Sequence, residues 1–373
     1  MQRGNSIDHM KIALLVDDLR IGGIQRLCLD QAYYLSDIGI DCEIWVYSKF
    51  DEDLESLENQ EVDLISSKLI KIIHLSGRRR EQGIETIKLL RVGSFDNIIA
   101  HSLRGSVISY LARPLIFKKY KILLTIHQLP SLSNFTQKFK RMFYSQFTDK
   151  LFIYSLAALN DWEKARRESL ILRIISWKKT PVLCRNGVYL NRLPILRPRV
   201  SPNSEVKRLI FLGRLTSWKG LEVFLRMSKI NDLDDLKFLI ISPTSPQKII
   251  SEVSNIDFEK FEQIIGKSLT NIELCHSDLH IFPVNHQNEF IESVSINVLE
   301  MSVLGIFSLV TKGGMYTWPE LIELGIVKEV DWNNNAEIVT EIFRLKGIKQ
   351  SETILKIREL ISIENNIKKL LSL

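Results

Sequence analysis

Short, strongly apolar runs rich in β-branched residues alternate with longer segments of helical periodicity along almost the whole chain. Runs with so little polar alternation are typical of parallel strands, because helices cover both faces of such a sheet. The pattern therefore predicts a doubly wound α/β fold, in which ligands bind at the carboxyl ends of the strands. We expect strands at residues 11–16, 41–47, 97–101, 121–127 and 151–155 in the first half and at 208–213, 237–242, 279–284 and 307–311 in the second.

A proline-rich segment separates two copies of this pattern. The stretch LPILRPRVSPNS holds three of the ten prolines, and after it the order of strand, glycine loop and helix begins again. A chain of 373 residues also exceeds what one hydrophobic core usually serves. We therefore expect two Rossmann-like domains facing a cleft. The expected parts are a loose leader at 1–10, a first domain at 11–192, a linker at 193–204, a second domain at 205–350 and a C-terminal segment at 351–373. We expect this last segment to form one or two helices that pack on the surface, with the first domain as the candidate partner.

Composition excludes several classes of protein. The four cysteines are scattered without a CxxC pair, which argues against a disulfide framework or a zinc site and suits a reducing cytosol. The polar start MQRGNSIDHM has no apolar core of a signal peptide. The longest apolar runs fall far short of the roughly 20 residues of a membrane-spanning helix. We therefore expect a cytoplasmic protein that is not integral to a membrane.

Positive charge is concentrated in one region. The net charge is +6, yet the segment from Arg113 to Lys179 holds 14 Lys and Arg against 4 Asp and Glu, a net of +10. Such an excess indicates an anionic partner surface. No nucleic-acid-binding motif accompanies it, so a membrane surface is favoured over nucleic acid. The candidate membrane-contacting cations are Lys118, Lys119, Lys138, Lys140 and Arg141.

Within this region, residues 135–147 have apolar side chains at helical spacing, with the cations elsewhere on the helix. A basic amphipathic helix of this kind fits an anionic bilayer surface. A helix that packs its phenylalanines into the core explains the same residues. The apolar positions are Phe135, Phe139, Met142, Phe143 and Phe147.

Two glycine loops follow predicted strands. Gly22 and Gly23 let a ligand approach the backbone at the start of a helix, although a plain tight turn explains them equally well. The second loop, FLGRLTSWKG, places Arg214 and Lys219 between glycines at the end of a strand. Two fixed cations can face a diphosphate there, while the alternative is a solvated turn.

The stretch ESVSINVLEMSVLG contains two acids, Glu292 and Glu300, separated by seven residues. It is similar to the E-x7-E signature of family 4 retaining glycosyltransferases of GT-B fold, and five further segments resemble that family in the expected order. Glu292 is followed by Ser293-Val294-Ser295, where the family has glycine and phenylalanine, which leaves the donor's identity open. The matching segments are KIALLVDDLRIGGIQR, AHSLRGSVISYLAR, LLTIHQLP, CRNGV, FLGRLTSWKG and ESVSINVLEMSVLGIFSLVTKGG.

The resemblance implies roles for the second half of the chain. Glu300 would bind the ribose hydroxyls of a nucleotide sugar and Glu292 the transferred sugar, since a carboxylate accepts from two neighbouring hydroxyls. The amides of Val294 and Ser295 would meet the donor phosphates. A helix cap plus one solvated glutamate is the simpler alternative for this motif.

The resemblance also implies catalytic roles. Arg214 and Lys219 would stabilise the leaving diphosphate, as fixed cations stabilise developing negative charge. His127, at the end of its strand, would contact the donor sugar near the reaction centre, although a lone histidine is more often a structural hydrogen bonder. His101 and Arg104 are candidate acceptor or cleft residues, and Gly22 and Gly23 would belong to the donor site. No DxD pair stands in a metal-binding context, so we expect neither a metal nor a cofactor.

The sequence therefore predicts a retaining, metal-independent glycosyltransferase. It would move a sugar from a nucleotide diphosphate sugar to a saccharide acceptor, a lipid-linked one by family habit, in surface polysaccharide or glycan assembly at the inner face of a membrane. Two alternatives stay open. One is a sugar-nucleotide epimerase or phosphorylase on the same fold, and the other is a catalytically silent protein that binds saccharide or a protein partner.

Overall fold

The structure is a computed structural model in which the chain forms two compact units. The first unit contains the described residues up to Tyr189 together with the last helix, and the second contains those from Leu190 to Ser362. The structure describes residues 10–19, 22–47, 65–68, 70–116, 119–127, 135–193, 206–213, 215, 219–242, 261–265, 274–275, 277–284, 295–315, 317–345 and 351–371.

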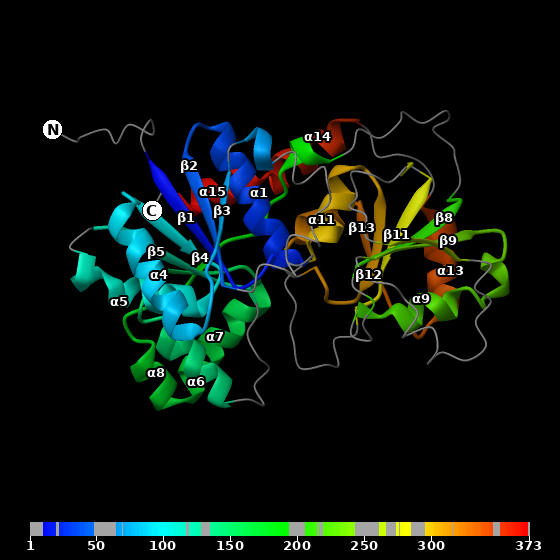
Figure 1. Ribbon diagram of the computed structural model, residues 1–373. Coiled ribbons are helices and arrows are strands. Elements are labelled where there is room, and N and C mark those ends of the chain that lie inside the picture. The colour runs from blue at the N-terminus through cyan, green and yellow to red at the C-terminus, as the bar shows by residue number, and fades with distance from the viewer. Residues whose placement is uncertain are drawn as a thin grey trace. The chain divides into compact units, whose positions relative to one another are not determined.

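In the described part of the first unit, seven parallel strands form a sheet in the order β3-β2-β1-β4-β5-β6-β7 (Figure 1). The interior strand β1 is buried from Ile12 to Val16 because helices cover both faces. The strands are β1 (Lys11–Val16), β2 (Asp41–Val46), β3 (Lys71–His74), β4 (Asn97–Ala100), β5 (Lys121–Ile126), β6 (Lys150–Ile153) and β7 (Val182–Leu183).

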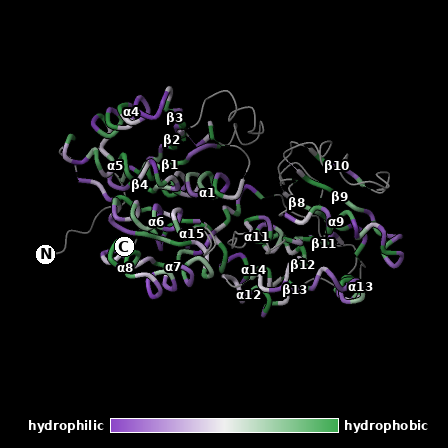
Figure 2. Tube along the Cα trace, turned by 90° about the horizontal axis from the view of Figure 1, so that it is seen from below, coloured by the Kyte–Doolittle hydropathy of each residue, from purple (hydrophilic) through white to green (hydrophobic). Residues whose placement is uncertain are grey.

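The helices of this unit lie on both sides of its sheet. The chain moves one way along the sheet from β1 to β2 and the other way from β3 to β4, so right-handed crossovers place α1 and α4 on opposite faces. Helix α15 packs beside α1, and Figure 2 shows α4 and α15 on opposite sides of β1 and β4. The helices are α1 (Gly23–Asp37), α4 (Arg79–Val92), α5 (Leu103–Ile116), α6 (Phe135–Tyr144), α7 (Leu156–Glu168), α8 (Leu170–Ile175) and α15 (Ile363–Leu371).

The second unit repeats this architecture. Its described strands form a six-stranded parallel sheet in the order β10-β9-β8-β11-β12-β13. The strands are β8 (Arg208–Leu212), β9 (Lys237–Ser242), β10 (Phe261–Ile265), β11 (Asp278–Phe282), β12 (Phe307–Thr311) and β13 (Val327–Val330). The helices are α9 (Leu221–Met227), α11 (Ile296–Val303), α12 (Pro319–Glu323), α13 (Asn335–Arg344) and α14 (Ser351–Ile361), with short 3₁₀ turns η2 (Leu190–Arg192) and η4 (Asn231–Leu233).

The expected doubly wound α/β fold is confirmed, with two sheets. Four strands were not predicted from the sequence, β3, β7, β10 and β13, and each is the outermost strand of its sheet. The strand order reverses between β1 and β4 in the first sheet and between β8 and β11 in the second. Ligands of such sheets bind at the carboxyl ends of the strands that flank this switch point.

The C-terminal tail is divided between the two units. Helix α14 packs on α11 in the second unit, where Nε of Arg358 donates to the carbonyl of Val303 at 3.3 Å. Helix α15 belongs to the first unit, where the side chain of Asn366 accepts a hydrogen bond from Gln31 of α1. The predicted C-terminal segment 351–373 therefore contains two helices, and each serves a different core.

Candidate functional site

Polar side chains meet at the switch point of the first sheet. Asp17 directly follows β1, His101 and Ser102 follow β4, and His127 follows β5. Oγ of Ser102 donates to Oδ1 of Asp17 at 2.6 Å, and Nδ1 of His101 lies 3.0 Å from Nε2 of His127. The structure thus brings two predicted site residues, His101 and His127, into contact. Asp17 and Ser102 were not predicted, although their position directly after apolar strands was a usable signal.

Both histidines are buried and neutral. Burial lowers the pKa of His101 to about 3. Burial, together with the neighbouring His101, holds the pKa of His127 well below its usual value. The His127 ring also stacks on Tyr154, with centroids 4.5 Å apart and ring planes 7° from parallel. Rings held in this way can donate or accept a hydrogen bond but carry no charge near pH 7.

Arg104 lies near the same edge. Its guanidinium carbon is 5.3 Å from the ring centroid of Tyr47, which follows β2. Burial raises the pKa of Asp17, while the bond from Ser102 and the charge of Arg104 oppose this rise. Arg104 is therefore part of the charge balance at the carboxyl edge of this sheet.

Gly22 and Gly23 begin helix α1. Gly22 is the N-cap residue, and no side chain caps the helix there. A Cβ built on Gly23 would have no atom within 4 Å. Gly22 has an extended φ of −174°, which any residue adopts, so the backbone conformation at Gly22 and the space around Gly23 do not require glycine. Their use in a donor site stays a prediction.

The switch point of the second sheet is closely packed. The side chain of Asn297, in α11, donates to the carbonyl of Leu212 at 2.8 Å, which holds α11 beside the end of β8. Gly220 has a φ of +76°, and a Cβ there would lie 1.8 Å from the carbonyl oxygen of Pro283, directly after β11. Glycine is therefore required at this position, because it lets the loop lie directly on the end of β11.

This packing positions Lys219. Its side chain is buried, and Nζ lies 5.1 Å from the ring centroid of Phe282, the last residue of β11. Ser295 is the N-cap residue of α11 and makes no side-chain capping bond. Two features predicted from the sequence therefore belong to the described part of this switch point. They are the cation Lys219 and the start of α11, the predicted anion-binding helix.

Glu300 is buried within α11 and forms an ion pair with Arg192 of η2. Arg192 was not predicted as a site residue. It lies 108 residues before Glu300, so no sequence spacing could have indicated it. The predicted ribose-binding carboxylate is thus held by a buried guanidinium of the same unit.

Comparison with known structures identifies the architecture. HepE of Anabaena in complex with UDP and glucose is 12% identical and has a TM-score of 0.67, covering 98% of this chain and 99% of that one. Sucrose-phosphate synthase of Thermosynechococcus elongatus is 13% identical, with a TM-score of 0.68 and coverage of 96% and 97%. A glycosyltransferase of Rickettsia africae is 19% identical, with a TM-score of 0.63 and coverage of 98% and 97%. The fold is GT-B. No protein-family model matches the chain, and no curated protein matches it.

Several predicted residues of this GT-B chain lie outside the described residues. They are Arg214, Glu292 and Val294 of the predicted donor site and Lys118 of the predicted membrane contact. Their roles stay predictions. In the described part, no group of three or more His, Cys, Asp or Glu side chains is arranged to hold a metal ion. No described helix is long and apolar enough to cross a bilayer.

The basic region requires a correction. Lys138 was predicted to contact a membrane, but its side chain is 4% exposed and pairs with Asp161 at 2.9 Å. It therefore stabilises the contact between α6 and α7 and is not available at the surface. Lys119 and Lys140 are exposed. Arg141 is half-buried, and this burial lowers its pKa.

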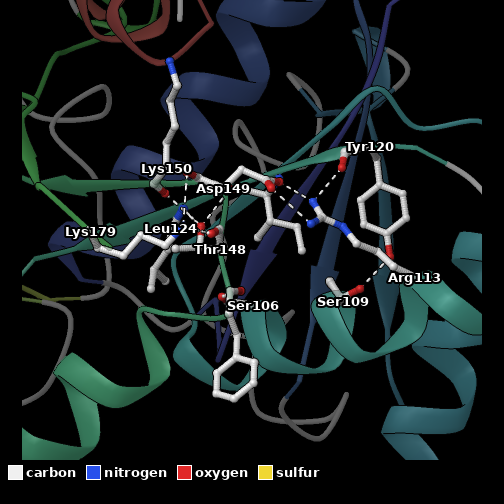
Figure 3. A network of polar contacts seen from close by, with 11 residues as sticks. Ser106, Ser109, Arg113, Tyr120, Leu124, Thr148, Asp149, Lys150 and Lys179 are labelled. Carbon is white, nitrogen blue, oxygen red and sulfur yellow. Dashed lines mark hydrogen bonds and ion pairs between the residues drawn. The ribbon is translucent and has the colours of Figure 1, made fainter. Parts of the chain in front are cut away.

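Other cations of this region are also held within the fold. Arg113 binds the carboxylate of Asp149, and Lys179 donates to the carbonyl of Thr148 (Figure 3). Asp149 also accepts from the amide of Ile122 at 2.7 Å. This network fixes the loop before β6 against α5 and β5. The net charge of +10 in the sequence therefore overstates the charge that this region presents to a partner.

Proposed function

We propose that this chain is a retaining glycosyltransferase of the family 4 type, which transfers a sugar from a nucleotide diphosphate sugar to an acceptor hydroxyl. The observation that supports it most is the position of Lys219, buried at the switch point of a GT-B sheet by a loop that only glycine permits at position 220. A cation fixed before the reaction can stabilise negative charge without reorganisation. HepE has been solved with UDP and with UDP-glucose, which makes UDP-glucose the first donor to test.

In this proposal the leaving diphosphate lies between Lys219 and Arg214, near the start of α11. Glu300, oriented by Arg192, accepts from the ribose hydroxyls, and Glu292 binds the transferred sugar. The bond from the anomeric carbon to the phosphate oxygen breaks as the acceptor oxygen bonds to the same face of that carbon. The electron pair stays on the diphosphate, which takes the proton of the acceptor hydroxyl. Retention follows from attack on the face that the diphosphate leaves.

We also propose that the acceptor is lipid-linked and that the protein works at an anionic membrane surface. Helix α8 and the turn after it expose Leu170, Ile171, Ile174 and Trp177, each between 56% and 67% exposed. Large apolar side chains that gather on one helix face mark an interaction surface. We call these four residues the α8 apolar face.

Helix α6 packs on α8 and also exposes aromatic side chains. Along α6 and the turn after it, the rings of Phe135, Phe139, Phe143 and Phe147 follow one another at centroid distances of 5.5 to 6.4 Å. Phe135 and Phe143 are exposed there. The cations Arg173 and Lys178 flank the α8 apolar face and are also exposed. Apolar side chains flanked by cations suit the interface of an anionic bilayer.

The transferase proposal is tested with the purified chain and a panel of UDP- and GDP-sugars, with membrane lipid extract as the source of acceptor. We expect release of nucleoside diphosphate, and Lys219→Ala should lower kcat by about 100-fold, comparable to removal of one preorganised donor. Lys229→Ala, a change at an exposed lysine just after α9, is the matched control and should leave turnover unchanged. Equal turnover of the two variants would contradict the proposal.

The alternatives give different results in the same assay. Epimerised donor without acceptor would indicate an epimerase, and phosphate-dependent cleavage of a glycoside would indicate a phosphorylase. Calorimetry that detects no binding of UDP, GDP or their sugars would indicate a silent binding protein.

A further inference from the structure

A continuous chain of hydrogen bonds leads from the backbone near the end of the first unit to His127. It begins at the carbonyl of Arg185, which accepts from Nδ2 of Asn366 at 2.7 Å. Oδ1 of Asn366 accepts from Nε2 of Gln31 at 2.8 Å. Oε1 of Gln31 lies 2.8 Å from Nε2 of His101, and Nδ1 of His101 lies 3.0 Å from Nε2 of His127. All five residues belong to the first unit.

The first link of this chain determines the direction of all the others. A backbone carbonyl can only accept, so the Asn366 amide must present its NH₂ group to Arg185 and its oxygen to Gln31. Gln31 must then present its own NH₂ group to Asn366 and its oxygen to His101. The oxygen of an amide accepts, so Nε2 of His101 carries a hydrogen.

The tautomer of His101 determines the tautomer of His127. His101 is neutral, so a hydrogen on its Nε2 leaves Nδ1 with a lone pair. A bare Nε2 of His127 would place two lone pairs 3.0 Å apart. The hydroxyl of Thr125 lies 2.9 Å from Nδ1 of His101 and 3.3 Å from Nε2 of His127, but it donates its hydrogen to the carbonyl of Ala100 at 3.2 Å. The hydrogen between the two rings is therefore the one on Nε2 of His127. Nδ1 of His127 is then left with a lone pair, and within the described residues it forms no hydrogen bond.

We call the chain from the Arg185 carbonyl through Asn366, Gln31 and His101 the amide relay. We propose that the amide relay holds His127 in the tautomer protonated on Nε2. Nδ1 of His127 then accepts a hydrogen bond from a hydroxyl of the bound sugar. Asn366, Gln31 and His101 are therefore positioning residues. The part that concerns the sugar rests on the proposed function, whereas the tautomer follows from the first unit alone.

Three further observations support this assignment. Stacking on Tyr154 fixes the plane of the His127 ring, and the second hydrogen of the Gln31 amide donates to the Tyr154 hydroxyl at 3.2 Å. Burial keeps both histidines neutral, so neither can satisfy its neighbours by taking up a second proton. His127 also directly follows β5, at the edge where a doubly wound sheet binds ligands.

The tautomer can be measured without substrate. The chain has seven histidines, so a protein labelled with ¹⁵N-histidine gives a spectrum that can be assigned with single His variants. We expect His101 and His127 of the free protein to be neutral and protonated on Nε2. A signal for His127 protonated on Nδ1, or on both nitrogens, at about pH 7 would overturn the proposal.

Gln31→Met and Gln82→Met form a matched pair of variants. Gln82 is a buried glutamine of the same unit, and its amide donates to the carbonyls of Tyr47 at 2.8 Å and Leu75 at 2.9 Å, outside the relay. We expect Gln31→Met to give a mixture of His127 tautomers and to lower kcat/KM by about tenfold, the effect of one lost hydrogen bond. Gln82→Met should keep the single tautomer. The same mixture in both variants, or in neither, would overturn the proposal.

These experiments separate the relay from the proposed function. If His127 has the expected tautomer and Gln31→Met disturbs it, while no nucleotide sugar is turned over, the relay is supported and the transferase proposal fails. Turnover by a protein whose His127 carries its hydrogen on Nδ1 would support the transferase and overturn the relay.

Discussion

The carboxylate of Glu300 is buried in α11, and its charge is balanced by the equally buried Arg192. Removing one partner of such a pair leaves the other charge buried and unpaired, whereas replacing both partners with uncharged groups is often tolerated. Glu300→Gln should therefore lower the free energy of unfolding by about 3–5 kcal/mol. Adding Arg192→Met to the same protein should recover most of that loss, as measured by urea denaturation of both variants. Two variants of equal stability would show that the pair does not act as a unit.

The residue scale also shows where sequence reasoning fails. The apolar residues around Glu300 predicted a helix there, and the structure places Glu300 in α11. The ion pair of Glu300 with Arg192 and that of Lys138 with Asp161 could not be predicted in this way. Each joins two elements that are distant in sequence. A lysine beside phenylalanines has the same sequence pattern whether it faces lipid or a buried aspartate. Only the packing of α6 on its neighbours decides between them.

At the scale of elements, the interior strands were predictable and the edge strands were not. A strand with neighbours on both sides and helices on both faces is a continuous apolar run, as in KIALLV of β1 or KFLIIS of β9. The four strands that were missed lie at sheet edges, and they are either short, as VL of β7, or partly polar, as VKEV of β13. Such strands lack the apolar signal because part of their surface stays in water.

The α8 apolar face is an element whose role can be tested directly. Burying one large apolar side chain contributes about 1.5–3 kcal/mol, so Ile174→Asp should weaken binding to anionic phosphatidylglycerol vesicles by at least tenfold in a sedimentation assay. Leu355→Asp is the matched control, because Leu355 in the second unit is 59% exposed and Ile174 is 60% exposed. Binding to neutral phosphatidylcholine vesicles should be weaker, since it lacks about 1 kcal/mol from each nearby cation.

Two outcomes would contradict a membrane role for this face. One is equal vesicle binding of Ile174→Asp and Leu355→Asp. The other is concentration-dependent dimerisation of the free protein that Ile174→Asp abolishes, which would indicate that the α8 apolar face binds a second copy of the chain.

For the whole molecule, both units contain buried, neutral histidines. Burial lowers the pKa of His101 in the first unit and of His280 in the second to about 3, from an ordinary value of 6.5. Above about pH 6.5 these groups are neutral in the folded and the unfolded chain and do not affect stability. As the pH falls below that value, the unfolded chain binds protons that the folded chain cannot bind until about pH 3. Both units should therefore lose stability in this interval.

We expect each buried histidine to lower the free energy of unfolding by about 1.4 kcal/mol per pH unit between about pH 6 and pH 4. Asp149 adds little in this interval: burial would raise its pKa, but bonds from Arg113 and the Ile122 amide outweigh burial and lower it, so its protonation reduces stability mainly as the pH falls to and below its ordinary pKa of 3.8. The raised pKa of Asp17 acts in the opposite direction in the first unit, so the second unit shows the histidine effect more directly. Urea denaturation at several pH values measures the slope. His280→Gln removes one titrating group and should make the slope shallower for the second unit, whereas parallel slopes for the variant and the unmodified protein would show that His280 takes up its proton in the folded state.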